Sequence, residues 1–283
     1  MSGIKKILLV NTQGKTWPQA AARAGQLASR FHLPSVDGVT TPASWRGNAA
    51  SAVLDMAERG GADLIVCPAS DRHLVLERLA PSCALRIAGQ SRAPVLLVSE
   101  KRAKAYSTVV VATDFSQASL SAAKTAAALA PSAHFVFLHA YRLPDEGLMR
   151  ELELPPRVIT AYRERGRAEA GKRLETLCGY FGNLVRSSSP LVCHGRLEHV
   201  LDGFARHGDA DLIVIGKRGR HAMAWPGMGS RVARLVNRPC CDVLVGASDD
   251  AGDSGRRRAL ERLAAIADTS RDRHAAPAVA KEN

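Results

Sequence analysis

Short aliphatic runs recur along the chain and alternate with longer segments in which alanine is mixed with charged residues. Most of these runs are apolar at every position, which is typical of parallel strands covered by helices on both faces. In the carboxyl-terminal part of the chain they predict strands at 108–113, 134–141, 184–193, 211–215 and 242–245. The segments between them predict helices at 117–129, 156–180, 197–207 and 230–237. The alternation therefore predicts an α/β fold with parallel sheets, in which Ser116 caps the first of these helices.

A repeat divides the chain into two copies of this pattern. The pentapeptide ADLIV occurs at 62–66 and again at 210–214, and the register continues so that Ser82 aligns with Ser230. The first copy has less chain between its first aliphatic run and ADLIV, so about one β–α unit is missing or reduced there. The predicted organisation is a shortened domain at 1–103, a second domain at 104–247, and a linker, short helix and disordered tail at 248–283.

The chain of 283 residues carries a formal net charge of +12, which favours an anionic partner such as a nucleotide, a nucleic acid or an acidic surface. Acidic and basic residues balance after Gly246, so the excess belongs to the two predicted domains. No apolar run reaches the roughly 18 residues that span a bilayer, and the amino terminus lacks the pattern of a signal peptide. We therefore expect a cytoplasmic protein with no membrane segment, whose six cysteines are reduced thiols.

A glycine-rich sequence follows the predicted strand at 211–215, with Gly216, Gly219, Gly229 and Ser230 leading into a predicted helix. Glycine lets backbone N–H groups approach a phosphate chain closely, and the start of the helix adds unpaired N–H groups and partial positive charge. No residue in this region is acidic, and its basic residues are Lys217, Arg218, Arg220, Arg231, Arg234 and Arg238. These features favour a phosphate-binding loop over the alternative, a flexible surface loop with solvated arginines.

The spacing Gly-x2-Gly-x9-Gly-Ser resembles the nucleotide motif of the universal stress protein family. The resemblance implies two tandem Rossmann-like domains of the adenine nucleotide alpha hydrolase type, with ATP or another adenine nucleotide as cofactor, with or without a divalent cation. It implies that Asp114, which follows Thr113 in the site, contacts the ribose or a metal ion. It places adenine against Ala140 and Ile215. The phosphate contacts that it implies are Gly216, Gly219, Gly229, Ser230 and the N–H of Arg231. An arginine at this last position departs from the family, which often has a small aliphatic residue there.

The first copy lacks the features of a phosphate site. At the matching spacing it has Pro68, Asp71, Pro81 and Ser82, and Thr12 stands where the second copy has its strand-end aspartate. Proline offers no N–H group, and an aspartate would repel phosphate. We therefore expect the first domain to contain a degenerate site and to have a scaffold or dimer-like role.

Three functions remain open at this point. The resemblance implies a stress-response protein that binds an adenine nucleotide in its second domain and acts as a regulatory module without efficient turnover. A slow ATP hydrolase or autophosphorylating protein using Ser230 is the second, although no general base is evident near that serine. A nucleic-acid-binding protein is the third, and the low aromatic content of 5% counts against it.

Other polar and sulfur-containing residues predict no further chemistry. His139, His194 and His199 lie near Cys193 without the spacing of a metal motif, so we predict no metal site. The pair Cys240-Cys241 precedes an apolar strand, which favours core packing over redox chemistry. We predict no catalytic residue.

The closing strands of the two domains, at 95–98 and 242–245, are short apolar runs and candidate sheet edges. Exposed apolar edges are usually covered or paired. We expect these two strands to pair with each other, which would give a pseudo-dimer of the two halves within one chain. A homodimer of whole chains is a further expectation.

Overall fold

The structure, a computed structural model, describes residues 3–11, 16–41, 49–69, 82–100, 104–141, 149, 151–217 and 240–247. Its strands are β1 (Ile7–Asn11), β2 (Asp37–Thr40), β3 (Leu64–Pro68), β4 (Val95–Val98), β5 (Thr108–Ala112), β6 (His134–Tyr141), β7 (Ser187–His194), β8 (Leu212–Ile215) and β9 (Asp242–Val245). Its helices are α1 (Trp17–Arg30), α2 (Ala49–Gly60), α3 (Cys83–Gln90), α4 (Gln117–Leu129), α6 (Pro156–Phe181) and α7 (Leu197–His207). We call residues up to Glu100 the first half and residues from Lys104 the second half.

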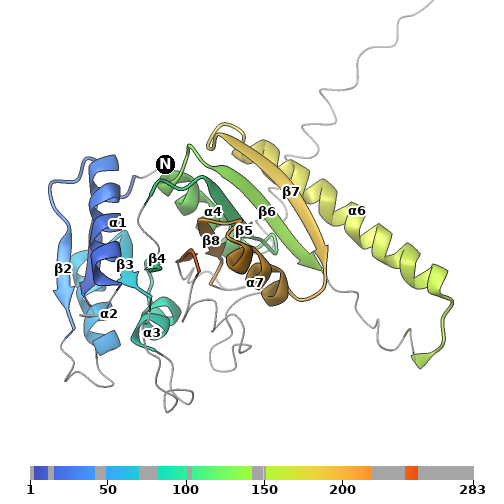
Figure 1. Cartoon of the computed structure of the whole chain (residues 1–283), viewed down its shortest axis with the longest axis horizontal. Coiled ribbons are helices and arrows are strands. Elements are labelled where there is room, and N and C mark those ends of the chain that lie inside the picture. Colours follow the sequence, from blue (N-terminus) through green and yellow to red (C-terminus); the bar gives the residue numbers. More distant parts are fainter. Residues whose placement is uncertain are drawn as a thin grey trace, which may run out of the picture.

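The described strands form one sheet in the order β2-β1-β3-β4-β9-β8-β5-β6-β7 (Figure 1). Neighbouring strands are parallel except at the junction of the halves, where β4 and β9 pair antiparallel, with Leu96 opposite Leu244. The prediction that the closing strands pair with each other is therefore confirmed. The predicted α/β class with mostly parallel strands is also confirmed.

Helices cover both faces of this sheet. The buried residues of α1, α4 and α6 pack in one apolar cluster, and those of α2, α3 and α7 pack in another. Successive strand residues alternate between the clusters: Leu8 and Val10 point to one and Ile7 and Leu9 to the other. Because both faces of central strands such as β3 and β4 are buried, these strands have no polar alternation, as the sequence pattern predicts. None of the helices in the described ranges is both long enough and apolar enough to cross a bilayer.

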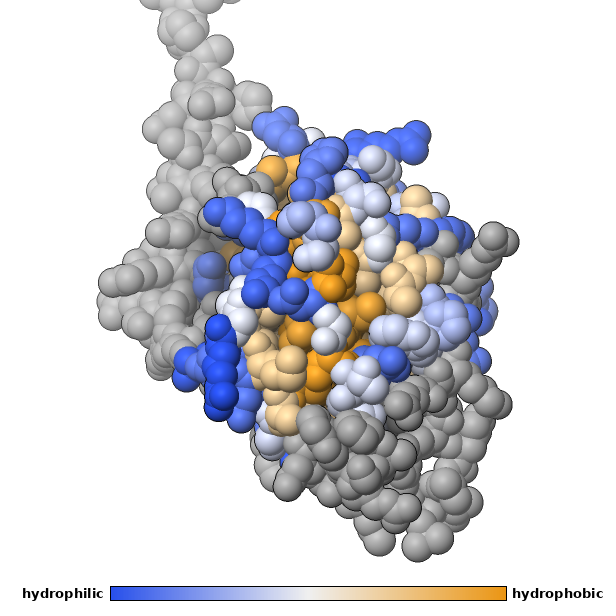
Figure 2. Space-filling view, turned by 90° about the vertical axis from the view of Figure 1, so that its left-hand side faces the viewer, coloured by the Kyte–Doolittle hydropathy of each residue, from blue (hydrophilic) through white to orange (hydrophobic). Residues whose placement is uncertain are grey.

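The two halves differ at their outer edges. Strand β2 lies beside β1 as β6 lies beside β5, but the second half continues with β7 and the long helix α6, which extends beyond the sheet (Figure 1). The described part of the first half has no counterpart of these two elements, so its predicted shortening is confirmed. At the outer edge of the first half, the four-residue strand β2 is the last strand of the sheet. Apolar residues are visible between hydrophilic side chains on this side of the molecule (Figure 2).

The local sequence predicts most element bounds well. Helices α4 and α7 and strands β6 and β9 begin and end where the pattern predicts, and the Ser116 hydroxyl caps α4 by accepting from the amide of Ser119. Strand β7 begins later than predicted, at Ser187. Helix α6 continues to Phe181, and the amide of Leu184 donates to the Phe181 carbonyl at 2.8 Å, so the chain turns there before it extends. The predicted helix at 230–237 and the tail at 248–283 lie outside the described residues.

The repeated ADLIV segment has a structural explanation. In the first half, Asp63 accepts hydrogen bonds from two consecutive backbone N–H groups just before β1, at 2.8 and 3.0 Å. In the second half, Asp211 accepts from the two corresponding N–H groups at the start of β5, at 2.8 and 3.1 Å. Burial raises the pKa of Asp211, but these hydrogen bonds and the nearby Lys104 ammonium outweigh burial and lower it. Each aspartate therefore aligns the start of one strand with its neighbour.

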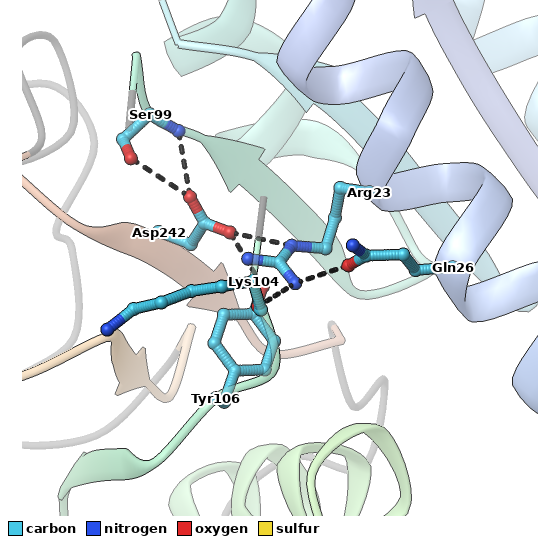
Figure 3. Close-up of polar contacts among 6 residues, drawn as sticks. All are labelled: Arg23, Gln26, Ser99, Lys104, Tyr106 and Asp242. Carbon is cyan, nitrogen blue, oxygen red and sulfur yellow. Dashed lines mark hydrogen bonds and ion pairs between the residues drawn. The ribbon is translucent and has the colours of Figure 1, made fainter. Parts of the chain in front are cut away.

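A buried polar network joins the halves beside the β4–β9 junction (Figure 3). The Asp242 carboxylate, at the start of β9, accepts hydrogen bonds from the backbone and hydroxyl of Ser99, at 2.9 and 3.1 Å. It also accepts from the Tyr106 hydroxyl at 2.7 Å and from Arg23 Nε at 3.0 Å. Burial, reinforced by the Asp242 charge, raises the pKa of Tyr106 well above its usual value, so this phenol stays a donor.

The Arg23 guanidinium, on α1, contacts residues of both halves. Its Cζ lies 4.0 Å from the centre of the Tyr106 ring, and its Nη1 donates to Gln26 at 2.9 Å and to the Lys104 carbonyl at 2.7 Å. Arg23 and Asp242 are 6% and 4% exposed. A buried ion pair is stable only when further hydrogen bonds compensate the loss of water, and here they do.

Candidate functional site

The strand order of the second half reverses between β5 and β8. Strand β5 continues the sheet towards β6 and β7, whereas β8 continues it towards β9, and the two strands are parallel, with Ala112 opposite Ile215. In doubly wound sheets, ligands bind outside the carboxyl ends of the strands at such a reversal. The residues that follow these ends are Thr113 and Asp114 after β5 and Gly216 after β8. The structure therefore brings these sequence-predicted residues to one place.

The turn after β5 is held by its own side chains. The buried Thr113 hydroxyl accepts from the amide of Phe115 at 3.0 Å and shares a hydrogen bond with the Ser119 hydroxyl, also at 3.0 Å. Asp114 Oδ1 accepts from the amide of Ser116 at 3.0 Å. Phe115 has a φ of 63°, a left-handed conformation that these hydrogen bonds support. Thr113 thus shapes the turn, and the turn sets the position of the Asp114 carboxylate.

His139, on β6, braces this turn from the neighbouring strand. Its Nδ1 lies 2.7 Å from the Thr113 carbonyl oxygen, and its ring centre lies 4.7 Å from that of Phe115. A carbonyl can only accept, so Nδ1 is the protonated nitrogen in this contact. His139 therefore supports the turn after β5, a role that the sequence does not show.

Gly216 is required by packing. A Cβ at this position would lie 2.9 Å from Ser119 N, 3.0 Å from Ser119 Cα and 3.1 Å from Ala118 C, all backbone atoms of the first turn of α4. Backbone of a helix cannot move aside cheaply, so the end of β8 can approach α4 only with glycine. The sequence assigned Gly216 to phosphate contact, and the structure adds a packing requirement that the spacing did not reveal.

Replacing Gly216 with alanine is therefore expected to destabilise the chain by about 1–3 kcal/mol, because β8 or α4 must shift. Urea unfolding measures the change. The matched control is Gly203→Ala on α7, where a Cβ would meet no atom within 4 Å, and which should be neutral or stabilising by about 0.5–1 kcal/mol. Equal stability of the two variants would refute the packing requirement.

The apolar residues predicted to line a base lie on the face of the sheet that α2, α3 and α7 cover. Ala140 and Ile215 are buried in the same apolar cluster. Lys217, which the sequence offered as one of several basic residues near a phosphate, is buried, and its ammonium donates to the Ser91 carbonyl at the end of α3. Its charge is directed towards the first half.

The remaining predicted phosphate contacts, Gly219, Gly229, Ser230 and Arg231, lie outside the described residues. In the first half, Thr12, Asp71 and Pro81 do so as well. Pro68 is the last residue of β3 and occupies the position that corresponds to Gly216, which follows β8 in the second half. Ser82, which aligns with Ser230, caps α3 by accepting from the amide of Leu85 at 3.3 Å. The first-half serine is thus a helix cap.

Other chemistry finds little support in the part of the chain that the structure describes. No group of three or more His, Cys, Asp or Glu side chains there could hold a metal ion. All six cysteines are free thiols. Cys241 is buried in the core and Cys240 is exposed, so only Cys241 has the packing role expected of the pair. Burial, with the nearby Cys83, raises the pKa of Cys67, which makes this thiol a poor nucleophile.

Comparison with known proteins identifies the family. The family model described as Universal stress protein family matches residues 5–99 and 105–246. No curated protein matches the sequence significantly. A functionally unknown protein from Pseudomonas aeruginosa PAO1 has a similar fold, with a TM-score of 0.58 and 16% identity, over 93% of this chain and 98% of its own.

Further solved structures are similar to this chain. A putative universal stress protein from Pseudomonas aeruginosa UCBPP-PA14 has a TM-score of 0.53 and 16% identity, over 92% of this chain and 98% of its own. A universal stress protein in complex with cAMP is 26% identical, with a TM-score of 0.32, over 52% of this chain and 100% of its own. Because the family model matches both halves, this chain belongs to the universal stress protein family as a tandem of two such domains.

Proposed function

We propose that the second half binds ATP or a related adenine nucleotide at the carboxyl ends of β5 and β8, and that the protein is a cytoplasmic regulatory module without efficient turnover. The observation that carries this proposal is the meeting of the Asp114 turn and the Gly216 strand end where the strand order reverses. The glycine-rich sequence that begins at Gly216 supplies the phosphate-binding pattern.

The described residues fit such a ligand. The Asp114 carboxylate is held at the strand end by the amide of Ser116, a position suited to a ribose hydroxyl or to a divalent cation bound with the phosphates. Ala140 and Ile215, which are buried in one apolar cluster, would lie beneath the base. Backbone N–H groups at Gly219, Gly229, Ser230 and Arg231 would hold the phosphates.

The turn offers binding groups but no catalytic arrangement. Its hydroxyls, on Thr113 and Ser119, bond each other, and His139 is engaged with the Thr113 carbonyl. A nucleophile needs an adjacent base that can take its proton. In the described part of the chain these groups act on the turn itself, which favours nucleotide binding over turnover.

Replacing Gly219 with aspartate is expected to abolish ATP binding, because a carboxylate would stand where phosphate binds. Isothermal titration calorimetry measures the affinity and the stoichiometry. The wild-type chain should bind one ATP, because Pro68, Asp71 and Pro81 make the first-half sequence unsuitable for binding phosphate. Gly171→Asp on α6, where a Cβ has open space, adds the same charge as a control and should bind like wild type. Unchanged affinity in a folded Gly219→Asp variant, or two equivalent sites per chain, would contradict the proposal.

The identity of the nucleotide can be tested separately. Mass spectrometry of small molecules released from protein purified under native conditions should detect ATP or another adenylate. Recovery of nucleic acid, together with steeply salt-dependent DNA binding and no competition by ATP, would instead favour a nucleic-acid-binding function.

A further inference from the structure

A buried side chain connects the proposed nucleotide site to the first half. Lys217 directly follows Gly216, yet its ammonium donates to the carbonyl of Ser91, 126 residues away. Lys217 is 7% exposed and Ser91 is 2% exposed, so the contact is inside the protein. A lysine on a flexible surface loop would instead keep its ammonium in water.

The antiparallel junction explains how these residues meet. Val95, at the start of β4, pairs with Val245, and Val245 pairs on its other side with Ile215, at the end of β8. Ser91 precedes β4 by only a few residues. The end of α3 in the first half is therefore brought beside the end of β8 in the second half. If β4 and β9 paired in parallel, the end of α3 would instead lie beside the amino end of β8.

The acceptor is a rigid and electrostatically suitable anchor. The Ser91 amide donates to the Ile87 carbonyl at 2.9 Å, and its hydroxyl donates to the Ala93 carbonyl at 2.8 Å. Ile87 is fully buried, so the last turn of α3 is fixed in the core. The carboxyl end of a helix carries partial negative charge and attracts cations. The ammonium of Lys217 therefore gains both a hydrogen bond and a favourable field.

We propose that Lys217 is a positioning residue, through which the first half fixes the strand end that leads into the glycine-rich sequence. Gly216 is held against α4 on one side, and Lys217 is held by α3 on the other. On the proposed function, the affinity of the second half for adenine nucleotide then depends on the first half. This assigns the half without a phosphate-binding sequence a direct part in nucleotide binding.

The proposal differs measurably from the alternative that Lys217 binds phosphate. A phosphate ligand affects nucleotide binding but not the exchange of residues 88–93 in the free protein, whereas a positioning residue affects both. In the full chain, Lys217→Met keeps the length of the side chain and removes the ammonium. We expect it to weaken ATP binding about tenfold, the loss expected from one hydrogen bond to a charged group. Lys217→Arg keeps a cationic donor and should restore most of the affinity.

Hydrogen exchange followed by mass spectrometry tests the anchor itself. Without nucleotide, the amides of residues 88–93 should exchange faster in Lys217→Met than in wild type. ATP should slow their exchange in wild type and in Lys217→Arg, but not in Lys217→Met. Lys172→Met removes an exposed ammonium on α6 and is the matched control, expected to behave like wild type in both respects.

Each outcome separates this inference from the function on which it rests. Equal exchange of residues 88–93 in Lys217→Met and wild type would overturn the anchor, whether or not ATP binds. Weaker ATP binding by Lys217→Met together with unchanged exchange in the free protein would show that Lys217 acts on the phosphates and overturn the positioning role. Absence of ATP and AMP binding in wild type would overturn the proposed function and the dependence of affinity on the first half, while faster exchange in Lys217→Met would still support the anchor.

Discussion

Replacing Asp242 with alanine is expected to destabilise the folded chain by about 3–5 kcal/mol, because it leaves the buried Arg23 without its counter-charge. The Tyr106 hydroxyl and the Ser99 amide lose their acceptor in the same step. Each buried donor that is left unpaired adds to the loss. Urea unfolding monitored by circular dichroism measures the free energy of unfolding.

Two further variants separate the buried network from ordinary surface charge. Glu169→Ala removes the partner of Arg173 in an exposed pair on α6, and should change stability by no more than about 1 kcal/mol. Adding Arg23→Met to Asp242→Ala removes the stranded charge and should recover part of the lost stability. A loss below about 1 kcal/mol for Asp242→Ala would show that the network does not hold the halves together.

Separating the two halves is expected to change the oligomeric state. A fragment of residues 105–247 lacks β4, the strand that pairs with β9. Val243, Leu244 and Val245 are fully buried in the whole chain, so the fragment would expose an apolar edge strand. Such an edge pairs readily with another chain. We therefore expect the fragment to dimerise or aggregate, which sedimentation velocity measures.

The control for this experiment retains the junction. A chain that ends at Gly246 keeps β4, β9 and the network around Asp242, and should stay folded and soluble without its tail. A well-behaved monomer of residues 105–247 would argue against the contribution of edge pairing. Aggregation of the chain ending at Gly246 would show that residues after it are needed for solubility.

Local patterns in the sequence determine the strands and helices and their order along the chain. The apolar runs identify the inner strands because helices cover both faces of these strands, and this leaves mainly aliphatic residues in them. Ser116 marks the start of α4 because a hydroxyl there satisfies a backbone amide of the first turn. The shorter first copy is visible from chain length alone. The glycine-rich spacing indicates a phosphate site, although its central residues remain a prediction.

Only the tertiary structure decides what residues do when their partners are distant in the chain. Asp242 reads as the polar start of a strand, yet it forms a buried pair with Arg23, 219 residues away. Gly216 reads as a phosphate contact, yet the approach of α4 also demands it. Lys217 reads as a cation facing phosphate, and it reaches α3 because β4 and β9 run antiparallel. Periodicity reports which face of an element is buried, whereas the pairing of distant elements determines which atoms meet there.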